Sequence, residues 1–316
     1  MTKVLITSRS FGQTDDRPFR ILEDAGISFL HMGADFDYAA FTEAVKDCDA
    51  LIIGAHKFDP ADLEACGKLR IICKHGTGVD NIPLAKAREM GITVTNVPAM
   101  NAEAVADLTF AFILDLNRGV SLSNTRVRAG EYKTFVGRDV WRKTLGLVGY
   151  GAVGKAVARR AAGFAMSVLV FDPFLDTLPE TGSGSPTLCG FDRLLAESDI
   201  VSIHAPLTED TRNLFDRDAI LRMRTDALLV NTARGGIVRE GDLYDCMKAG
   251  QLFGAALDVT EEEPIPAGHP LLTLDNVLIT PHIGMYSAET LGAVGIVCAE
   301  NVVRMLRGET PLYIVK

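Results

Sequence analysis

Short, β-branched apolar runs alternate along the chain with segments whose apolar residues recur at helical spacing. This alternation is typical of a mostly parallel sheet covered by helices on both faces. Prolines near a first turn predict helices at Pro60–Cys66 and Pro83–Met90. The first third therefore predicts one compact α/β unit, with strands at Val4–Ser8, Ala50–Ala55, Arg70–Gly76 and Ile92–Val97.

A second unit is predicted after a break at Pro98. Residues 101–119 carry apolar side chains on one helical face, between an asparagine suited to an N-cap and a glycine suited to a left-handed end. Residues 120–143 are polar and irregular and predict an arm that lies over the molecule or over a partner subunit. A last helix is expected at about Ala288–Leu306, and the final PLYIVK can add a closing strand to either unit. The expected strands of the second unit are Leu145–Gly149, Val168–Phe171, Ile200–His204, Leu228–Asn231, Ala255–Val259 and Val277–Thr280.

Composition narrows the class of protein. The 316 residues fit two domains of roughly 150 residues each, with 47% apolar and 23% charged residues. The absence of a long apolar run and of a leader pattern predicts a cytoplasmic protein without a membrane partner. The net charge of -9 with no basic cluster argues against nucleic acid. Six scattered cysteines without a CxxC pair predict reduced thiols, no disulfide framework and no metal site.

The stretch GYGAVG follows a predicted strand and opens a predicted helix. Gly149 permits the tight turn, Gly151 lets backbone amides approach a pyrophosphate, and Gly154 permits close helix–strand packing. Alone, the motif also fits a simple glycine turn. The next strand ends in Asp172, whose carboxylate can accept the ribose hydroxyls of adenosine and repel a 2′-phosphate. The pair of signals predicts bound NAD rather than NADP.

Ionisable side chains follow the later strands, where ligands of open α/β sheets bind. Arg234, Asp258 and His282 stand just after three of these strands, and Glu263 lies a few residues beyond one. Each alone is compatible with a surface or packing role. Hydride transfer to a ketone needs a proton donor, which a histidine paired with a carboxylate supplies near neutral pH. A guanidinium grips a planar carboxylate with two parallel hydrogen bonds.

A series of segments then occurs in an order that resembles a known family: CKHGTGVDNI, NVPAMNAEAVADLT, KTLGLVGYGAVGKAVA, VFDP, HAPLT, LVNTARGGIV, LDVTEEEP and TPHIG. The chain resembles the D-isomer-specific 2-hydroxyacid dehydrogenases, particularly their phosphoglycerate dehydrogenase branch. The resemblance implies an NAD-dependent α/β enzyme made of two doubly wound parallel-sheet domains, Rossmann- or flavodoxin-like, with a cleft between them. Residues 1–98 plus 285–316 would bind substrate, and residues 99–284 would bind NAD. A homodimer is also expected.

The resemblance assigns roles residue by residue. His282 would donate and accept the proton, Glu263 would be its partner, and Arg234 would anchor the substrate; Glu263 is preferred over Glu261 and Glu262 because it directly precedes a proline. Cofactor contacts would come from Gly149, Gly151, Ala152, Val153, Gly154, Asp172, His204, Ala205, Pro206, Thr232, Ala233, Asp258, His282 and Gly284. Substrate contacts would come from Lys74, His75, Gly76, Thr77, Gly78, Arg234 and His282, with the glycine-rich loop forming a nest of backbone N–H groups.

The particular hydroxy acid is left open by the sequence. Lys74 and His75 precede the nest and favour a substrate with a second anionic group, such as 3-phosphoglycerate, unless Lys74 is only a solvated charge. Gly54 stands where phosphoglycerate enzymes of the family tend to place an arginine, which keeps hydroxypyruvate and glyoxylate as alternatives. After His282 the family often has two glycines, whereas this chain reads HIGMYS, so Met285 and Tyr286 either face the substrate or pack.

A rival hypothesis from another class is a protein that senses dinucleotides and regulates transcription by binding partners without turnover. The sequence gives it little support, because no extra peptide-binding or disordered segment is visible. Turnover of a keto acid would separate the two classes.

Overall fold

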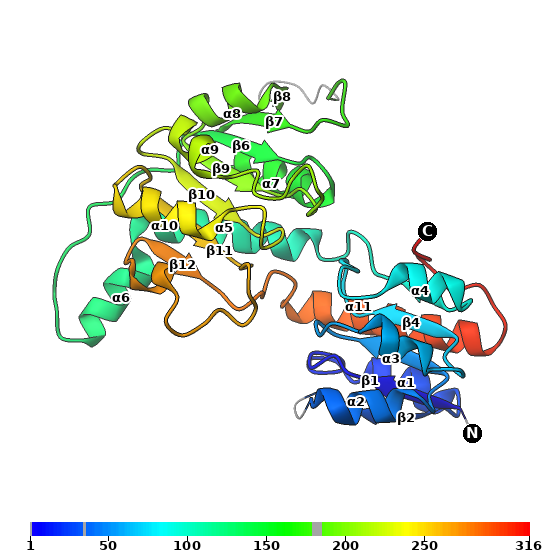
Figure 1. Ribbon diagram of the computed structural model, residues 1–316. Coiled ribbons are helices and arrows are strands. Elements are labelled where there is room, and N and C mark those ends of the chain that lie inside the picture. Colours follow the sequence, from blue (N-terminus) through cyan, green and yellow to red (C-terminus); the bar gives the residue numbers. More distant parts are fainter. Residues whose placement is uncertain (1, 34–35, 179–184) are drawn as a thin grey trace. The chain divides into compact units, whose positions relative to one another are not determined.

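The computed structural model describes residues 2–33, 36–178 and 185–316. The chain divides into two compact units, which Figure 1 shows in sequence colours. The first unit contains Met1–Asn101 and Met285–Lys316, and the second contains Ala102–Gly284. The break expected at Pro98 thus lies just before the boundary between them.

The first unit is built on a five-stranded sheet in the order β2-β1-β3-β4-β5, with every pair parallel. Its strands are β1 Lys3–Ile6, β2 Ser28–His31, β3 Ala50–Ile53, β4 Ile71–Lys74 and β5 Thr93–Thr95. Its helices are α1 Arg17–Asp24, α2 Tyr38–Val45, α3 Pro60–Glu64, α4 Leu84–Glu89 and α11 Ala288–Leu306. The sequence did not predict β2, because this edge strand has no buried residue and so no apolar alternation.

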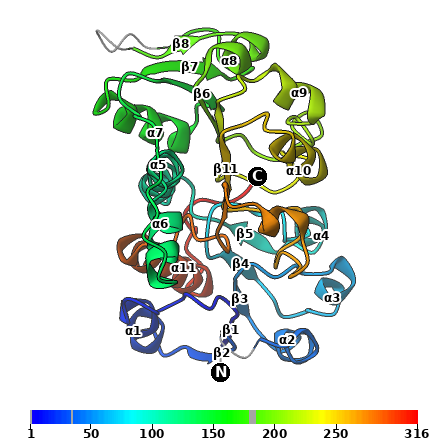
Figure 2. The same ribbon diagram turned by 90° about the vertical axis from the view of Figure 1, so that its left-hand side faces the viewer.

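Residues of one strand alternate between two cores in this unit. Val4 and Ile6 pack with α1 and α11, whereas Leu5 packs with α2 and α3 on the other face. Figure 2 shows the same division, with α1 and α11 on one side of the strands and α2, α3 and α4 on the other. The closing segment does not form a full strand. It makes a single antiparallel bridge between Ile314 and Thr95, supported by a 2.8 Å hydrogen bond from the amide of Val315 to the carbonyl of Val94.

The second unit carries a seven-stranded parallel sheet in the order β12-β11-β10-β9-β6-β7-β8. The strand order reverses direction beside β6, and ligands of such sheets bind at the carboxyl ends of strands near this point. Its strands are β6 Thr144–Val148, β7 Ser167–Phe171, β8 Thr187–Leu188, β9 Ile200–Ile203, β10 Leu228–Asn231, β11 Gly254–Leu257 and β12 Val277–Ile279. Its helices are α5 Ala102–Arg118, α6 Val120–Arg128, α7 Ala152–Ala162, α8 Phe191–Glu197, α9 Arg217–Arg222, α10 Glu240–Lys248 and the 3-10 helix η1 Pro270–Thr273.

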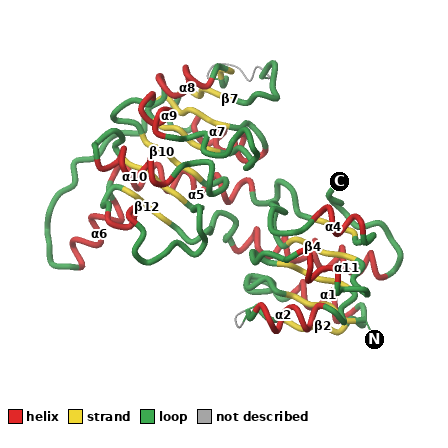
Figure 3. Tube along the Cα trace, in the orientation of Figure 1, coloured by secondary structure: helices red, strands yellow, loops and turns green. Residues whose placement is uncertain are grey.

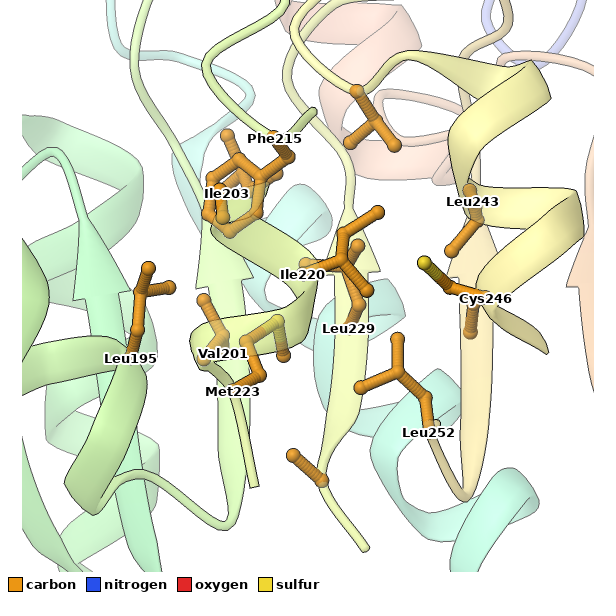
Figure 4. Close-up of a cluster of buried hydrophobic side chains, with 14 of the residues drawn as sticks. Leu195, Val201, Ile203, Phe215, Ile220, Met223, Leu229, Leu243, Cys246 and Leu252 are labelled. Carbon is orange, nitrogen blue, oxygen red and sulfur yellow. The ribbon is translucent and has the colours of Figure 1, made fainter. Parts of the chain in front are cut away.

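Two cores again cover the two faces of this sheet. The helices α5 and α7 pack on one face, and α8, α9 and α10 pack on the other. Figure 4 shows part of the second core, where Val201, Ile203 and Leu229 of the strands meet Ile220 and Leu243 of the helices. Two parallel-sheet α/β units are the predicted fold class.

One prediction about the second unit was partly wrong. Residues 120–143 were expected to be irregular, but α6 occupies their first part. The helix has no buried residue, so the sequence shows no apolar periodicity there. Gly119 ends α5 and precedes α6 in the left-handed conformation that the sequence predicts, with φ 60°. Figure 3 shows the long loop that follows α6.

Candidate active site

The turn between β6 and α7 has one open glycine and two tightly packed ones. A Cβ on Gly149, which has φ 94°, would lie 2.8 Å from the amide nitrogen of Ala205, and one on Gly154 would lie 2.3 Å from the carbonyl oxygen of Gly149. A Cβ on Gly151 would meet nothing within 4 Å. Gly151 precedes α7 without a side-chain cap, so backbone amides at this helix end are open toward a ligand. This geometry fits a bound pyrophosphate.

Asp172 lies directly after β7 and faces the same turn. Its Oδ2 accepts a 2.9 Å hydrogen bond from the amide of Tyr150, and its Oδ1 accepts a 3.1 Å bond from the amide of Phe174. A carboxylate has about four acceptor positions, so two bonds leave capacity for hydroxyl groups of a ribose. Ala152 and Val153 form the first residues of α7. The structure therefore brings together the residues that are predicted to bind the pyrophosphate and the ribose.

The loop after β9 begins with His204, Ala205 and Pro206. The Nε2 atom of His204 lies 2.9 Å from the hydroxyl of Ser202, and its buried Nδ1 has no hydrogen-bond partner among the described residues. Burial lowers the pKa of His204 to about 3, so this ring is neutral at pH 7. His204 therefore supplies no positive charge at this edge of the sheet.

The turn after β10 is held by a residue that the sequence analysis missed. Asn231 is 1% exposed; its Oδ1 accepts from the amide of Ala233 at 3.0 Å and its Nδ2 donates to the carbonyl of Arg234 at 2.9 Å. The Nη1 of Arg234 donates to the carbonyl of Ala233 at 2.7 Å. The buried hydroxyl of Thr232 lies 3.2 Å from that of Thr109. The available signal was a polar residue ending the apolar strand LLVN.

Asp258 fastens the loop that carries His282. Its Oδ1 accepts from the hydroxyl of Thr280 at 2.6 Å and from the amide of Ile283 at 2.8 Å, and its Oδ2 accepts from the amide of Gly284 at 2.8 Å. The amide of His282, which has φ 54°, donates to the carbonyl of Asp258 at 2.9 Å. Burial raises the pKa of Asp258, against the effect of these donors. The cofactor contact expected of Asp258 must therefore share oxygens that already bind the loop.

His282 and Glu263 lie in direct contact. The Nδ1 of His282 is 2.8 Å from Oε2 of Glu263, and the two side chains are 46% and 39% exposed. The other oxygen of Glu263 accepts from the amide of Thr260 at 3.3 Å. Partial burial raises the pKa of Glu263, but the bond to His282 and its charge outweigh burial, so that pKa lies below its usual value. Nε2 of His282 has no hydrogen-bond partner in the part of the chain that the structure describes.

Of the three consecutive acids, Glu263 is the one that meets the histidine. Glu261 instead accepts a 2.8 Å hydrogen bond from the amide of Glu240, through Oε1. The carbonyl of Glu262 accepts from the hydroxyl of Thr260 at 2.7 Å. The choice of Glu263, which the sequence based on the following proline, agrees with this geometry.

In the first unit, the residues before the glycine-rich loop are less available than the sequence suggests. Lys74 donates through Nζ to the carbonyl of Gly54 at 2.6 Å and to Oδ1 of Asn81 at 3.1 Å. His75 is 4% exposed, with Nδ1 at 3.0 Å from the hydroxyl of Ser8. Burial, and then the charge of Lys74, lowers the pKa of His75 to about 3. His75 is therefore neutral at pH 7, and its contact with a substrate stays a prediction.

The loop at Gly76, Thr77 and Gly78, which the sequence predicts to be a nest, has two open backbone amides. Gly76 has φ 144°, and the Thr77 hydroxyl donates to the carbonyl of Val97 at 3.0 Å. Asn96 donates through Nδ2 to the carbonyl of Thr77 at 2.7 Å. The amides of Thr77 and Gly78 donate to no acceptor within the described ranges. Two adjacent open amides can both donate to a carboxylate.

Met285 and Tyr286, which follow Gly284 in the loop after His282, differ in exposure. Met285 packs against the core formed with α1 and α11, and its sulfur is 3.6 Å from the place that a Cβ on Gly76 would take. Tyr286 is 51% exposed. Met285 is therefore a packing residue of the first unit, whereas Tyr286 is accessible.

Comparisons with known proteins agree with this geometry. Residues 110–284 match the family described as D-isomer specific 2-hydroxyacid dehydrogenase, NAD binding domain. A glyoxylate reductase of Korarchaeum cryptofilum is 42% identical over 280 residues, which are 85% of this chain and 83% of that protein. A D-3-phosphoglycerate dehydrogenase of Methanocaldococcus jannaschii is 36% identical over 98% of this chain but 58% of its own length. The crystal structure of the TT0316 protein of Thermus thermophilus matches with TM-score 0.91, 36% identity and full coverage of both chains.

The chain belongs to the D-isomer specific 2-hydroxyacid dehydrogenases. It is thus an NAD-dependent oxidoreductase that acts on the CH–OH group of small 2-hydroxy acids, and the predicted cofactor is confirmed. The described parts of this dehydrogenase contain no cluster of three His, Cys, Asp or Glu side chains that could hold a metal ion. All six cysteines are free thiols. Within the same described ranges, no helix has the length and apolar character needed to span a bilayer.

Proposed function

We propose that this dehydrogenase interconverts a short 2-keto acid and its D-2-hydroxy acid, with His282 as proton donor and acceptor and Glu263 as its partner. The observation that carries this proposal is the 2.8 Å contact between Nδ1 of His282 and Oε2 of Glu263. A carboxylate on Nδ1 orients the ring and leaves Nε2 to exchange a proton with the substrate oxygen. Reduction then consumes the proton of an imidazolium, and oxidation needs the neutral ring.

Arg234 is proposed to bind the substrate carboxylate or its carbonyl oxygen. The turn after β10 presents its guanidinium from a backbone that Asn231 holds at both Ala233 and Arg234. A guanidinium matches the planar carboxylate with two parallel bonds, which an ammonium does not. The open amides of Thr77 and Gly78 supply further donors for a carboxylate. We accordingly propose that the first unit binds substrate and the second unit binds NAD.

The residues of the second unit fit the cofactor in a defined way. We propose that the amides at the start of α7 bind the pyrophosphate and that Asp172 accepts from the ribose hydroxyls of the adenosine. When bound, the nicotinamide supplies or accepts the hydride. The remaining cofactor contacts proposed are His204, Ala205, Pro206, Thr232, Ala233, Asp258 and Gly284, all of which lie in loops that follow β9, β10, β11 and β12.

The surroundings of the nest support a substrate without a second anionic group, such as glyoxylate or hydroxypyruvate. Burial lowers the pKa of His75 to about 3 and that of His56 to about 4, so neither is charged at pH 7. A Cβ on Gly54 would lie 3.0 Å from Cα of Ser8, so this backbone leaves little room for a side chain. The similar glyoxylate reductase supports the same substrate class.

A phosphorylated substrate is the second candidate, because Lys74 stands just before the nest. The test is NADH oxidation with glyoxylate, hydroxypyruvate, a longer unbranched 2-keto acid and 3-phosphohydroxypyruvate. We expect the first two to have the highest kcat/KM. A preference for the phosphorylated acid would establish the second candidate. NADH binding without turnover of any of the four would instead favour the sensing hypothesis.

A homodimer is proposed from the apolar side chains along residues 120–143. These side chains are exposed over more than half of their surface: Val120 60%, Val127 53%, Tyr132 94%, Val136 90% and Trp141 56%. Apolar groups in such number along one segment mark a protein interface. Analytical ultracentrifugation should give a dimer for the native chain and a monomer for the double variant Tyr132→Asp/Val136→Asp.

A further inference from the structure

Two glutamates outside the proposed catalytic contacts bind each other's backbone. The amide of Glu240 donates to Oε1 of Glu261 at 2.8 Å, and the amide of Glu261 donates to Oε1 of Glu240 at 2.6 Å. Glu240 begins α10 and is 5% exposed, whereas Glu261 is exposed. This exchange satisfies two backbone donors reciprocally, as a capping box does within one helix. It fastens the loop after β11 to the start of α10.

The buried carboxylate of Glu240 has a second partner. Its Oε2 lies 3.1 Å from Nε2 of His269, whose Nδ1 accepts from the amide of Leu271 at 3.4 Å. Because Nδ1 is an acceptor, the neutral ring carries its proton on Nε2 and donates it to Glu240. Both oxygens of this carboxylate therefore bind donors, which offsets the cost of burying it. Glu240 is fixed from two sides.

The loop that Glu240 fastens is the one that presents Glu263. The amide of Thr260 donates to Oε1 of Glu263 at 3.3 Å. A Cβ on Gly235 would lie 1.9 Å from the carbonyl oxygen of Thr260, so the turn that carries Arg234 packs directly on this loop. A shift of the backbone at Thr260 and Glu261 would move Glu263 relative to His282.

We infer that the reciprocal pair of Glu240 and Glu261 is a positioning clamp, which holds the loop after β11 so that the carboxylate of Glu263 stays against Nδ1 of His282. The inference rests on the proposed function, in which Glu263 is the partner of His282. Neither clamp residue touches the reacting groups in this role. Both act through the backbone of the loop.

The experiment follows the titration of the His282 imidazole by NMR in full-length protein with 13C-labelled histidine, with the signal assigned by its loss in His282→Ala. In Glu263→Gln, the midpoint should move to lower pH, because a neutral amide no longer favours the imidazolium. Glu261→Ala should move it by roughly half as much, because the carboxylate is present but no longer held.

Glu262→Ala is the matched control, because it removes the same charge from the adjacent residue. Only the carbonyl of Glu262 takes part in a hydrogen bond within the described ranges, and alanine keeps that carbonyl. Its midpoint should stay within about 0.2 unit of wild type, as expected for one exposed charge in salt. Equal shifts in Glu261→Ala and Glu262→Ala would overturn the clamp. No shift in Glu263→Gln would instead overturn the pairing on which the proposed function depends.

A second pair of variants separates position from charge at the buried end. Glu240→Gln keeps an oxygen that can accept from the amide of Glu261, whereas Glu240→Ala removes it. We expect the alanine variant to shift the His282 midpoint as Glu261→Ala does, and the glutamine variant to stay near wild type. Equal shifts in both would show that the charge of Glu240, and not its hydrogen bond, matters, and would overturn the clamp. KM for NADH should not change in Glu261→Ala, which separates the effect from a loss of cofactor binding.

Discussion

His75 of the first unit and His282 of the second each lie just beyond the carboxyl end of a parallel strand, and the two have opposite surroundings. His75 follows β4 directly, is 4% exposed, and has a serine hydroxyl as the partner of its Nδ1. His282 follows β12 by three residues. Its side chain is 46% exposed and has the carboxylate of Glu263 as the partner of its Nδ1. The strand end places both rings where ligands of α/β sheets bind.

The difference between His75 and His282 shows that a position at a strand end does not by itself make a histidine a proton donor. Burial lowers the pKa of His75 to about 3, so this ring stays neutral and packs edge-on against Phe11 at a centroid distance of 5.7 Å. A proton donor needs access to solvent or substrate and a group that stabilises its charged form. Only His282 of the two has both. The comparison therefore assigns chemistry to one ring and packing to the other.

The largest expected effect comes from removing each ring in turn. His282→Ala should lower kcat by about 10²–10⁴-fold, the usual contribution of a positioned acid–base group, with little loss of stability. His75→Ala should leave kcat within about threefold and lower the free energy of unfolding by roughly 1–3 kcal/mol, because a buried ring and its hydrogen bond are lost. Steady-state kinetics and urea unfolding measure both. The comparison breaks if His75→Ala loses activity as severely as His282→Ala.

The sequence predicted the strand ends well because they depend on local pattern. Buried parallel strands give continuous apolar runs, and the residues that follow them must lie at one edge of the sheet. The glycines of the turn could also be predicted from the sequence. A Cβ on Gly149 or Gly154 would lie 2.8 or 2.3 Å from a backbone atom, so only glycine fits at these positions. These features placed Arg234, Asp258 and His282 correctly in loops after strands.

The burial of individual side chains and their hydrogen-bond partners far along the chain could not be predicted from the sequence. His75 and Lys74 look alike in sequence as cations before a glycine loop, but the core of the first unit covers the ring of His75. The hydrogen bond from Asn231 to the carbonyl of Arg234 depends on the conformation of the turn. The hydrogen bond between Glu240 and Glu261 joins residues that are 21 apart in the chain. Surface helices such as α6 leave no apolar period for the sequence to show.

The next effect tests whether two cations of the second unit, Arg234 and Arg239, also differ in role. Arg234→Lys keeps the charge but loses the paired donors, and it should cost about 2–4 kcal/mol of transition-state stabilisation, seen as a higher KM and a lower kcat. Arg239→Lys is the control, because Arg239 lies in the same connection and is 61% exposed beside Asp242. Near-normal kinetics in Arg234→Lys would remove this residue from the substrate contacts.

A smaller effect concerns binding without proton transfer. Asp172→Ser should weaken NADH binding by roughly tenfold and relax discrimination against NADPH, because the ribose contact and the repulsion of a 2′-phosphate disappear together. Asp176→Ser removes a charge a few residues away in the chain and should change neither. Fluorescence titration with both cofactors gives the two constants. A wild type that prefers NADPH would contradict the assignment of Asp172.

The finest test asks whether the carboxylate beside His282 is the reason why this ring, unlike His75, works as an acid. Glu263→Gln keeps the size and one acceptor of the side chain but removes its charge, so the imidazolium loses its stabilising partner. Reduction, which needs the protonated ring, should therefore lose kcat/KM at a lower pH than in wild type. Oxidation, which needs the neutral ring, should extend toward acid by the same amount. The lowered pKa of Glu263 keeps its carboxylate charged even below its ordinary titration range, so the wild-type pair is lost only in more acidic solution. The pH profiles of both directions, with Glu262→Gln as the control, decide the matter. If wild type and Glu263→Gln give coincident profiles, Glu263 is not the partner that stabilises the imidazolium of His282, and the contrast with His75 reduces to exposure alone.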